Sequence, residues 1–165
     1  MKSFSLEAID RAFEAEVLSL FRSCSGYFHM TEGQEAGPAS VMEFFEERPP
    51  GSLPGEKHVF GVFVGNILAG VVDLVENYPQ PGEWIIGLLL LHPDFRGRGL
   101  GKGVHEELVL LARAGGAGKM RIGVVEQNHE GLAFWSRLGY RETGRTLPRQ
   151  TGNKKNVIII MNLAI

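Results

Sequence analysis

One stretch, residues 83–103, constrains the fold more than any other part of the chain. Its first part, from Trp84 to Leu91, is a continuous apolar run of the length expected for a strand buried on both faces. Pro93 then ends the strand, because proline has no backbone N–H for the ladder. Four glycines follow within seven residues, and from Leu100 onward apolar residues recur at helical spacing. The stretch predicts a buried strand, a glycine-rich turn and the start of a helix.

A turn of this kind is suited to binding an anion. The N–H groups of a helix's first turn lack intrahelical partners, and the positive end of the helix dipole lies beside them, so we expect a phosphate group there. Two common phosphate motifs do not fit. The pattern G-x-x-x-x-G-K-[ST] fails because Gly103 stands where Ser or Thr should follow the lysine. The pattern G-x-G-x-x-G fails because Lys102 occupies the third glycine position after Gly97 and Gly99.

The pattern that does fit is R-x-x-G-x-G. Its residues are Arg96, Gly97, Arg98, Gly99, Leu100 and Gly101. In this context it resembles the acyl-coenzyme A loop of the GNAT superfamily of N-acetyltransferases, where the loop also follows a strand and opens a helix. The resemblance implies that the backbone from Gly97 to Lys102 holds the pyrophosphate of acetyl-coenzyme A. It also implies that the backbone of Leu89, Leu90 and Leu91 pairs with the pantetheine arm. An incidental glycine-rich turn is the alternative.

Length and composition indicate an ordinary globular chain. At 165 residues we expect one domain, residues 1–165, with 44% hydrophobic and 22% charged residues. The net charge of −2 and the lack of a membrane-length apolar run favour neither a nucleic acid nor a membrane as partner. The single Cys24 excludes an internal disulfide, and the five histidines lack metal-ligand spacing, so we expect no metal. The chain reads as cytoplasmic, and the sequence leaves open whether it forms a homodimer.

The remaining periodicity predicts alternating strands and helices. We expect strands at 2–7, 58–64, 67–75, 84–91, 120–124, near 140–146, and at 157–163. We expect helices at 10–23, 38–47, 99–114 and 130–138. Residues 24–37 show no period and are predicted to be irregular, and the basic residues before the last strand are predicted to form a loop.

This order predicts an α+β fold with a mixed, mostly antiparallel twisted sheet of six to seven strands flanked by about four helices. The strand–helix–strand unit of residues 84–125 should form one parallel pair through a right-handed crossover. The order resembles the GNAT fold over nearly the full length of the chain. The resemblance implies that the two parallel strands splay apart and that the pantetheine arm enters the gap.

A second similarity lies in residues 128–140. Asn128 and the run Leu138-Gly139-Tyr140 match a GNAT pattern near the pantetheine arm and its sulfur. Asn128 is interpreted both as a helix cap and as a cofactor contact, two roles that do not exclude each other. Trp135 stands where many members place the Tyr that protonates the leaving thiolate, and an indole N–H cannot deliver a proton at neutral pH. We predict that Trp135 packs in the cleft wall near the sulfur.

The usual general base is also missing. Many members use a Glu eleven residues before the first residue of the loop, and Ile85 occupies that position here. Glu83 lies on the same strand face, so we predict it as the replacement base, with a solvated strand-end glutamate as the alternative.

The resemblance implies an acetyl-coenzyme A-dependent N-acetyltransferase. A primary amine of a small molecule or peptide would attack the thioester directly in a ternary complex. The alternatives are a non-catalytic acyl-coenzyme A-binding or sensing module and, less well supported, a nucleotide-binding domain. An acidic segment at 31–47 favours a cationic acceptor, whereas a basic segment at 141–155 favours a carboxylated one, and the sequence leaves this choice open.

Overall fold

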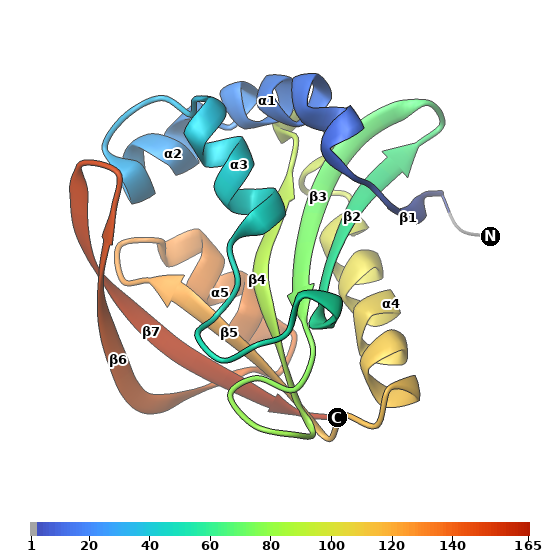
Figure 1. Ribbon diagram of the computed structural model, residues 1–165, viewed down its shortest axis with the longest axis vertical. Helices are drawn as coiled ribbons and strands as arrows, with labels where there is room; N and C mark the ends of the chain where they lie inside the picture. Colours follow the sequence, from blue (N-terminus) through green and yellow to red (C-terminus); the bar gives the residue numbers. More distant parts are fainter. Residues whose placement is uncertain (1–2) are drawn as a thin grey trace.

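The computed structural model describes residues 3–165, which form a single mixed sheet with helices on both faces (Figure 1). The sheet has seven strands in the order β1-β2-β3-β4-β5-β7-β6. The strands are β1 (Ser5–Ala8), β2 (Lys57–Val64), β3 (Ile67–Val75), β4 (Glu83–Leu91), β5 (Lys119–Val125), β6 (Arg141–Thr151) and β7 (Lys154–Ala164). Every neighbouring pair is antiparallel except β4 and β5, which are parallel. This confirms the predicted α+β fold with one parallel pair.

Two layers of helices cover the sheet (Figure 1). One layer contains α1 (Glu14–Ser23), α2 (Ser25–Glu32) and α3 (Pro38–Glu46), and the other contains α4 (Leu100–Ala114) and α5 (His129–Arg137). The side chains of β3 alternate between the layers: Val71 packs with α1–α3, whereas Val72 and Leu74 pack with α4 and α5. Each face of the sheet therefore has its own hydrophobic core.

Helix α2 corrects the prediction that residues 24–37 are irregular, and it raises the helix count from about four to five within residues 3–165. Its sequence, S-G-Y-F-H-M-T-E, has low helix propensity and a weak apolar stripe. Packing against α1 stabilises the helix despite this low propensity. The ring centroids of Phe28 and of Phe21 on α1 lie 4.8 Å apart. Tertiary contacts of this kind stabilise most short helices in proteins.

The C-terminal hairpin is the second correction. The basic residues predicted to form a loop lie in β6, which pairs with β7 from Thr151↔Lys154 onward around a turn at Gly152-Asn153. Strand β6 is the exposed edge of the sheet, and charged residues are common on edge strands because they discourage further pairing. The predicted first strand begins at residue 2, outside the described residues, and the observed strand begins at Ser5.

The parallel pair opens into a wedge. Strands β4 and β5 are paired only from Glu83↔Lys119 to Ile86↔Ile122. Beyond that point β4 continues along β3 as far as Leu91, and β5 continues along β7 as far as Val125. A bulge at Gly87 marks the divergence, because Ile86 and Leu88 pair with successive residues of β3. The splayed pair expected from the sequence is therefore present, closed at Glu83 and open toward Leu91.

Candidate active site

The glycine-rich loop lies between the open end of the wedge and helix α4. Gly97 and Gly99 have φ of 75° and 80°, a left-handed conformation that glycine adopts without strain. No atom lies within 4 Å of the place where a side chain would start at either residue. The loop therefore leaves its backbone open to a ligand.

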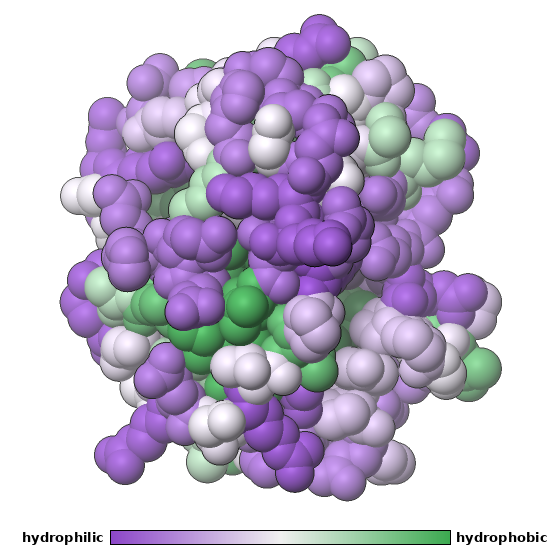
Figure 2. All heavy atoms as spheres, turned by 90° about the vertical axis from the view of Figure 1, so that its left-hand side faces the viewer, coloured by the Kyte–Doolittle hydropathy of each residue, from purple (hydrophilic) through white to green (hydrophobic). Residues whose placement is uncertain are grey.

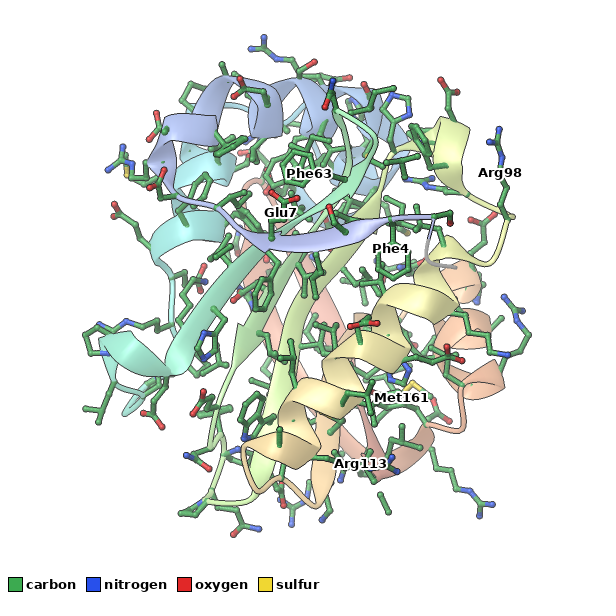
Figure 3. The ribbon with its side chains drawn as sticks, turned by 90° about the vertical axis from the view of Figure 1, so that its right-hand side faces the viewer. Phe4, Glu7, Phe63, Arg98, Arg113 and Met161 are labelled. Atoms are coloured by element: carbon green, nitrogen blue, oxygen red, sulfur yellow. The ribbon has the colours of Figure 1, made fainter. Side chains whose placement is uncertain are left out.

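The loop also offers a row of unpaired donors. The backbone N–H groups of Gly97 to Lys102 have no hydrogen-bond partner among residues 3–165, and the first bond of α4 is donated by Gly103 N to Gly99 O at 3.0 Å. The side chain of Arg98 projects from the loop into solvent (Figure 3), and Lys102 is also exposed. Free N–H groups, the helix dipole and two nearby cations fit a pyrophosphate.

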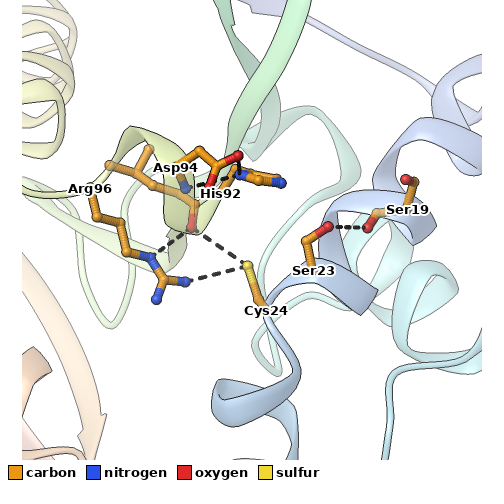
Figure 4. Close-up of polar contacts among 7 residues, drawn as sticks. Ser19, Ser23, Cys24, His92, Asp94 and Arg96 are labelled. Atoms are coloured by element: carbon orange, nitrogen blue, oxygen red, sulfur yellow. Dashed lines mark hydrogen bonds and ion pairs between the residues drawn. The ribbon is translucent and has the colours of Figure 1, made fainter.

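The side chain of Arg96 points away from the phosphate cradle and ties the loop to the sheet. Its Nε donates to the carbonyl oxygen of Leu91 at 2.9 Å, and its Nη2 lies 3.4 Å from the Sγ of Cys24 (Figure 4). Cys24 in turn donates from Sγ to the same Leu91 oxygen at 3.5 Å. Burial raises the pKa of the Cys24 thiol, with Arg96 opposing the shift, so the thiol stays protonated and acts as a donor. Arg96 therefore positions the end of β4.

Within residues 3–165, the end of β4 has no neighbouring strand on its wedge side, where the Leu91 oxygen is bonded only to the side chains of Arg96 and Cys24. His92 N donates to Ala69 O on β3, and strand backbone groups alternate in direction, so those of Leu91 and Leu89 point toward β5. No strand pairs with them on that side within the described residues. The two residues, with Leu90 between them, therefore form the kind of edge along which an extended ligand can lie.

Gly101 has a packing role. A side chain placed there would begin 3.1 Å from the ring of Phe134 on α5 and 3.6 Å from Leu91. Phe134 therefore borders the first turn of α4, which the sequence did not indicate because Phe134 lies off the apolar stripe of Leu132, Trp135 and Leu138. Phe4, before β1, lies against the same turn near Gly103 (Figure 3).

The structure places the residues of the second constellation at α5. Asn128 is the N-cap, since its Oδ1 accepts from Gly131 N at 2.9 Å. Trp135 is only 8% exposed and packs in the core, with ring centroids 5.9 Å from His105 and 5.2 Å from Tyr140. Both residues thus hold α5 in place.

Glu83 is remote from the loop, at the closed end of the wedge. Its Oε1 accepts from Gln80 Nε2 at 2.8 Å and lies 3.3 Å from Lys119 Nζ, and the residue is buried. The rise of a strand puts Glu83 about 13 Å from Gly87 along β4. A buried, paired carboxylate at that end fits a structural role, and Glu83 as the general base stays a prediction.

Two glycines flank the mouth of the wedge. After the last pair, Ile86↔Ile122, the next residues on the two strands are Gly87 and Gly123, and both are exposed although β4 and β5 are interior strands. A side chain on Gly87 would begin 2.6 Å from Oδ2 of Asp73 on β3. The Asp73 carboxylate therefore lies directly against the backbone at the point where the sheet opens.

Asp73 is a buried carboxylate that sequence reasoning missed, although an Asp inside the apolar run V-V-D-L-V is a visible signal. Lys57 Nζ lies 3.0 Å from its Oδ1, and the Asp73 side chain is 17% exposed. Burial raises the pKa of Asp73, and the charge of Lys57 partly offsets that rise. The site thus holds a carboxyl group whose affinity for a proton is greater than usual.

Arg121 is a second residue that the sequence did not single out. It pairs with Ile85 across the closed part of the wedge, and its buried Nε has no hydrogen-bond partner within the described residues. Met120 and Ile122 pack toward α4 and α5, so alternation turns Arg121 toward the α1–α3 side, as it does Gly123. Arg121 therefore brings a positive charge to the α1–α3 side of the wedge.

The acidic and basic segments meet each other. Arg149 Nη2 on β6 lies 3.0 Å from an oxygen of Glu47, and Asn153 Nδ2 donates to Gln34 Oε1 at 2.8 Å. These contacts join the β6–β7 hairpin to the α2–α3 side of the molecule. Seen from the side that carries the hairpin, Figure 2 shows hydrophobic surface in a recess between hydrophilic rims. The acidic and basic segments therefore partly neutralise each other's charge.

Two further findings concern the described residues. No cluster of three or more His, Cys, Asp or Glu side chains in residues 3–165 has the arrangement needed to hold a metal ion. None of the helices in that range has both the length and the apolar character required to cross a membrane.

Comparisons with known proteins give the site its context. Residues 15–140 match the model of the acetyltransferase (GNAT) family. No curated protein matches the chain by sequence at a significant level.

Solved structures share the fold over nearly the whole chain. An acetyltransferase from Thermus thermophilus is 20% identical, with a TM-score of 0.76, and the match covers 99% of this chain and 98% of that one. The ribosomal-protein-S18-alanine N-acetyltransferase from Escherichia coli is 15% identical, with a TM-score of 0.69 and coverage of 98% and 94%. The PaiA N-acetyltransferase from Thermoplasma acidophilum, solved in complex with coenzyme A, is 14% identical, with a TM-score of 0.68 and coverage of 99% and 100%. With the family model spanning most of the chain, this protein belongs to the GNAT acetyltransferase family.

Proposed function

We propose that this protein transfers an acetyl group from acetyl-coenzyme A to a primary amine of a small molecule or peptide. The observation that carries the proposal is the row of unpartnered N–H groups from Gly97 to Lys102, set at the start of α4 beside the open end of the wedge. A pyrophosphate at that row would use N–H groups that otherwise lack partners among residues 3–165, and an acyl arm in the wedge would lie along the side of β4 that no other strand pairs with beyond Ile86. We place the reaction in the cytoplasm.

The chain's residues would hold the co-substrate in two parts. The backbone of Gly97 to Lys102 would bind the pyrophosphate, with Arg98 and Lys102 adding positive charge. The outward-facing backbone of Leu89 and Leu91 would pair with the amides of the pantetheine arm. Bound there, acetyl-coenzyme A supplies an activated thioester.

The acetyl group would pass to the amine without an enzyme-bound intermediate. The single cysteine, Cys24, is buried, and its protonated thiol is bonded to the Leu91 carbonyl, so it is not an available nucleophile. The protein's contribution is to hold the amine against the thioester in a partly desolvated wedge, which lowers the entropic barrier of the reaction.

The departing thiolate needs no dedicated acid. Trp135 lies in the core against His105 and Tyr140 and does not carry a transferable proton. A free thiol has a pKa of about 8.5, so a thiolate can leave near neutral pH and take its proton from solvent.

A non-catalytic acyl-coenzyme A-binding module is the rival function, and two measurements separate the two. Calorimetry should show that acetyl-coenzyme A binds, which both functions require. Release of free thiol should then be followed with a panel of primary amines that includes simple alkylamines, polyamines, amino acids and a short peptide. The amino acids belong in the panel because the positive charge of Arg121 on the α1–α3 side of the wedge would favour a carboxylate. Binding without thiol release from any amine would support the rival.

A further inference from the structure

We propose that Asp73 is the general base of the reaction, taking the proton from the attacking amine at the mouth of the β4–β5 wedge. The inference rests on the proposed function and names a residue that performs it.

The Asp73 carboxylate lies at the mouth of the wedge. Asp73 Oδ2 lies where a side chain of Gly87 would begin, so it is in contact with the β4 backbone at the first unpaired position of the wedge. Gly87 and Gly123 are both exposed, and neither has a side chain to block the approach. An amine that enters between these glycines comes within reach of the Asp73 carboxylate, which lies against Gly87.

The distance along β4 also favours Asp73 over Glu83. Leu91, beside the loop, lies four positions after Gly87, and the rise of a strand makes this about 13 Å. A pantetheine arm extended from a pyrophosphate at the loop spans such a distance, which brings the thioester carbonyl close to Gly87. Glu83 lies a further four residues away, past the point where Ile86 and Ile122 close the sheet. Asp73, and not Glu83, is therefore the carboxylate at the end of the arm.

The charge around the Asp73 carboxylate comes from Lys57 and Glu47. Lys57 from β2 lies 3.0 Å from Oδ1, and its Nζ also donates to Glu47 O at 2.7 Å, so the ammonium is fixed on one side. Apart from this ion pair, the buried Oδ1 has no hydrogen-bond partner within residues 3–165. The other charged group that acts on Asp73 is Glu47, at the end of α3, whose carboxylate is bonded to Arg149 of β6. Strand β4 adds no titratable neighbour, because Gly87 and Leu88 face Asp73 from it.

This surrounding suits proton transfer. Burial raises the pKa of Asp73 and Glu47 adds to the rise, whereas Lys57 keeps it from becoming extreme. A carboxylate with a raised pKa accepts a proton from an ammonium more readily than an exposed one does at neutral pH.

The proposed step balances without a further reactant. Asp73 Oδ2 takes a proton from the ammonium form of the acceptor, and the freed amine nitrogen then forms a bond to the thioester carbonyl carbon and gives its surplus proton to solvent. The tetrahedral intermediate then expels the coenzyme A thiolate as the C–S bond breaks. Asp73 returns its proton to solvent or to the thiolate, which leaves amide, thiol and the original carboxylate.

The central experiment compares Asp73→Asn with Glu83→Gln as a matched control, since both remove a carboxylate from the same sheet. Acetyl-coenzyme A affinity is measured by calorimetry, and turnover by thiol release with the best amine of the panel. Loss of a general base reduces kcat by about 10²-fold or more, so we expect that loss for Asp73→Asn only, with nearly unchanged affinity. A folded Asp73→Asn protein with turnover close to the parent would overturn the proposal, as would a large loss confined to Glu83→Gln.

Hydroxylamine separates catalysis from damage to the site. It is already largely unprotonated at neutral pH, so its acetylation should depend much less on Asp73. We expect Asp73→Asn to lose far more activity toward an alkylamine than toward hydroxylamine. Equal losses toward both would indicate a purely structural role and overturn the proposal. If the single variant does not fold because Lys57 is left buried and unpaired, the double variant Lys57→Met, Asp73→Asn removes both charges and is compared with Lys57→Met.

The variant Lys57→Met tests the catalytic role through the pH dependence of kcat, which a purely structural role of Asp73 would not change. Removing the ammonium raises the pKa of Asp73 further, so the acidic limb of the pH–kcat profile should shift to higher pH. Carboxyl-detected NMR of the ligand-free protein should show the same shift, and acetyl-coenzyme A should perturb the Asp73 signal. If the parent protein binds acetyl-coenzyme A but acetylates no amine, the proposed function fails. NMR would still test whether Asp73 lies beside the bound thioester. An Asp73 signal that does not change when acetyl-coenzyme A binds would overturn that placement.

Discussion

The imidazole Nε2 of His105 and the phenol of Tyr140 are hydrogen-bonded at 2.9 Å in the core between α4 and the end of α5. Both residues are buried, and Trp135 packs against both rings. The three side chains join α5 to α4, and α4 carries the glycine-rich loop at its N-terminus. The helix that carries the glycine-rich loop is therefore held in place partly by His105, a titratable side chain in the core.

Stability should fall as the solution becomes mildly acidic, through His105. Burial lowers the pKa of His105 below its usual 6.5, with Glu106 opposing the shift. The unfolded chain therefore binds a proton that the folded protein resists, and the free energy of unfolding falls with pH from about 7 down to the folded pKa. We expect urea unfolding at pH 7.5 and 5.5 to show less pH dependence for His105→Gln than for the parent. Equal pH dependence in the two proteins would contradict this prediction.

A substitution in the loop should separate backbone strain from ligand binding. Gly99 and Gly116 both have left-handed φ, 80° and 88°, with open space where a side chain would start. Alanine at either position should destabilise the fold by about 1–2 kcal/mol. Only Gly99→Ala should also weaken acetyl-coenzyme A binding, because only Gly99 lies in the cradle. Calorimetry and thermal unfolding of both variants make the test, and equal affinities would refute the assignment of the loop.

Arg96 and Arg98 should contribute to binding in different ways. Arg96→Met removes the bond to the Leu91 carbonyl and the contact with Cys24, so it should loosen the end of β4 and increase hydrogen exchange there. Arg98→Met leaves the fold intact and should weaken coenzyme A binding mainly at low ionic strength, where an exposed charge is poorly screened. Calorimetry at two salt concentrations distinguishes them. An Arg98 effect that is independent of salt would argue against an electrostatic role.

Trp135 should matter for stability far more than for turnover. Trp135→Ala should lower the free energy of unfolding by about 3–5 kcal/mol, since the ring is buried among His105, Phe134 and Tyr140. Trp135→Phe keeps most of the ring volume and should retain most of the rate. Trp135→Tyr should not exceed the parent in thiol release. A clear gain with Tyr would show that a proton donor had been limiting, and a dead but folded Phe variant would show that the indole takes part in the chemistry.

The sequence predicted the strand–turn–helix of residues 83–103 because periodicity, proline and glycine all agree there. It did not predict α2, because packing of Phe28 on Phe21 outweighs weak local propensity. Asp73 was missed for a related reason: its role depends on the register of β3 against the Gly87 bulge, which no local pattern encodes. The position of Trp135 followed from helical spacing, but spacing alone did not show which neighbours it would meet.

The wedge also has a mechanical consequence. Beyond Ile86 and Ile122 the strands β1–β4 and β5–β7 form two half-sheets, joined edge to edge only by the short ladder that starts at Glu83 and Lys119 within the described part of the chain. In the proposed pose the pantetheine arm would act as a missing strand, linking the half-sheets where the protein has no ladder of its own. Binding of acetyl-coenzyme A would then strengthen the protein mechanically. In a single-molecule pulling experiment, the force needed to separate β4 from β5 should be higher when acetyl-coenzyme A is bound.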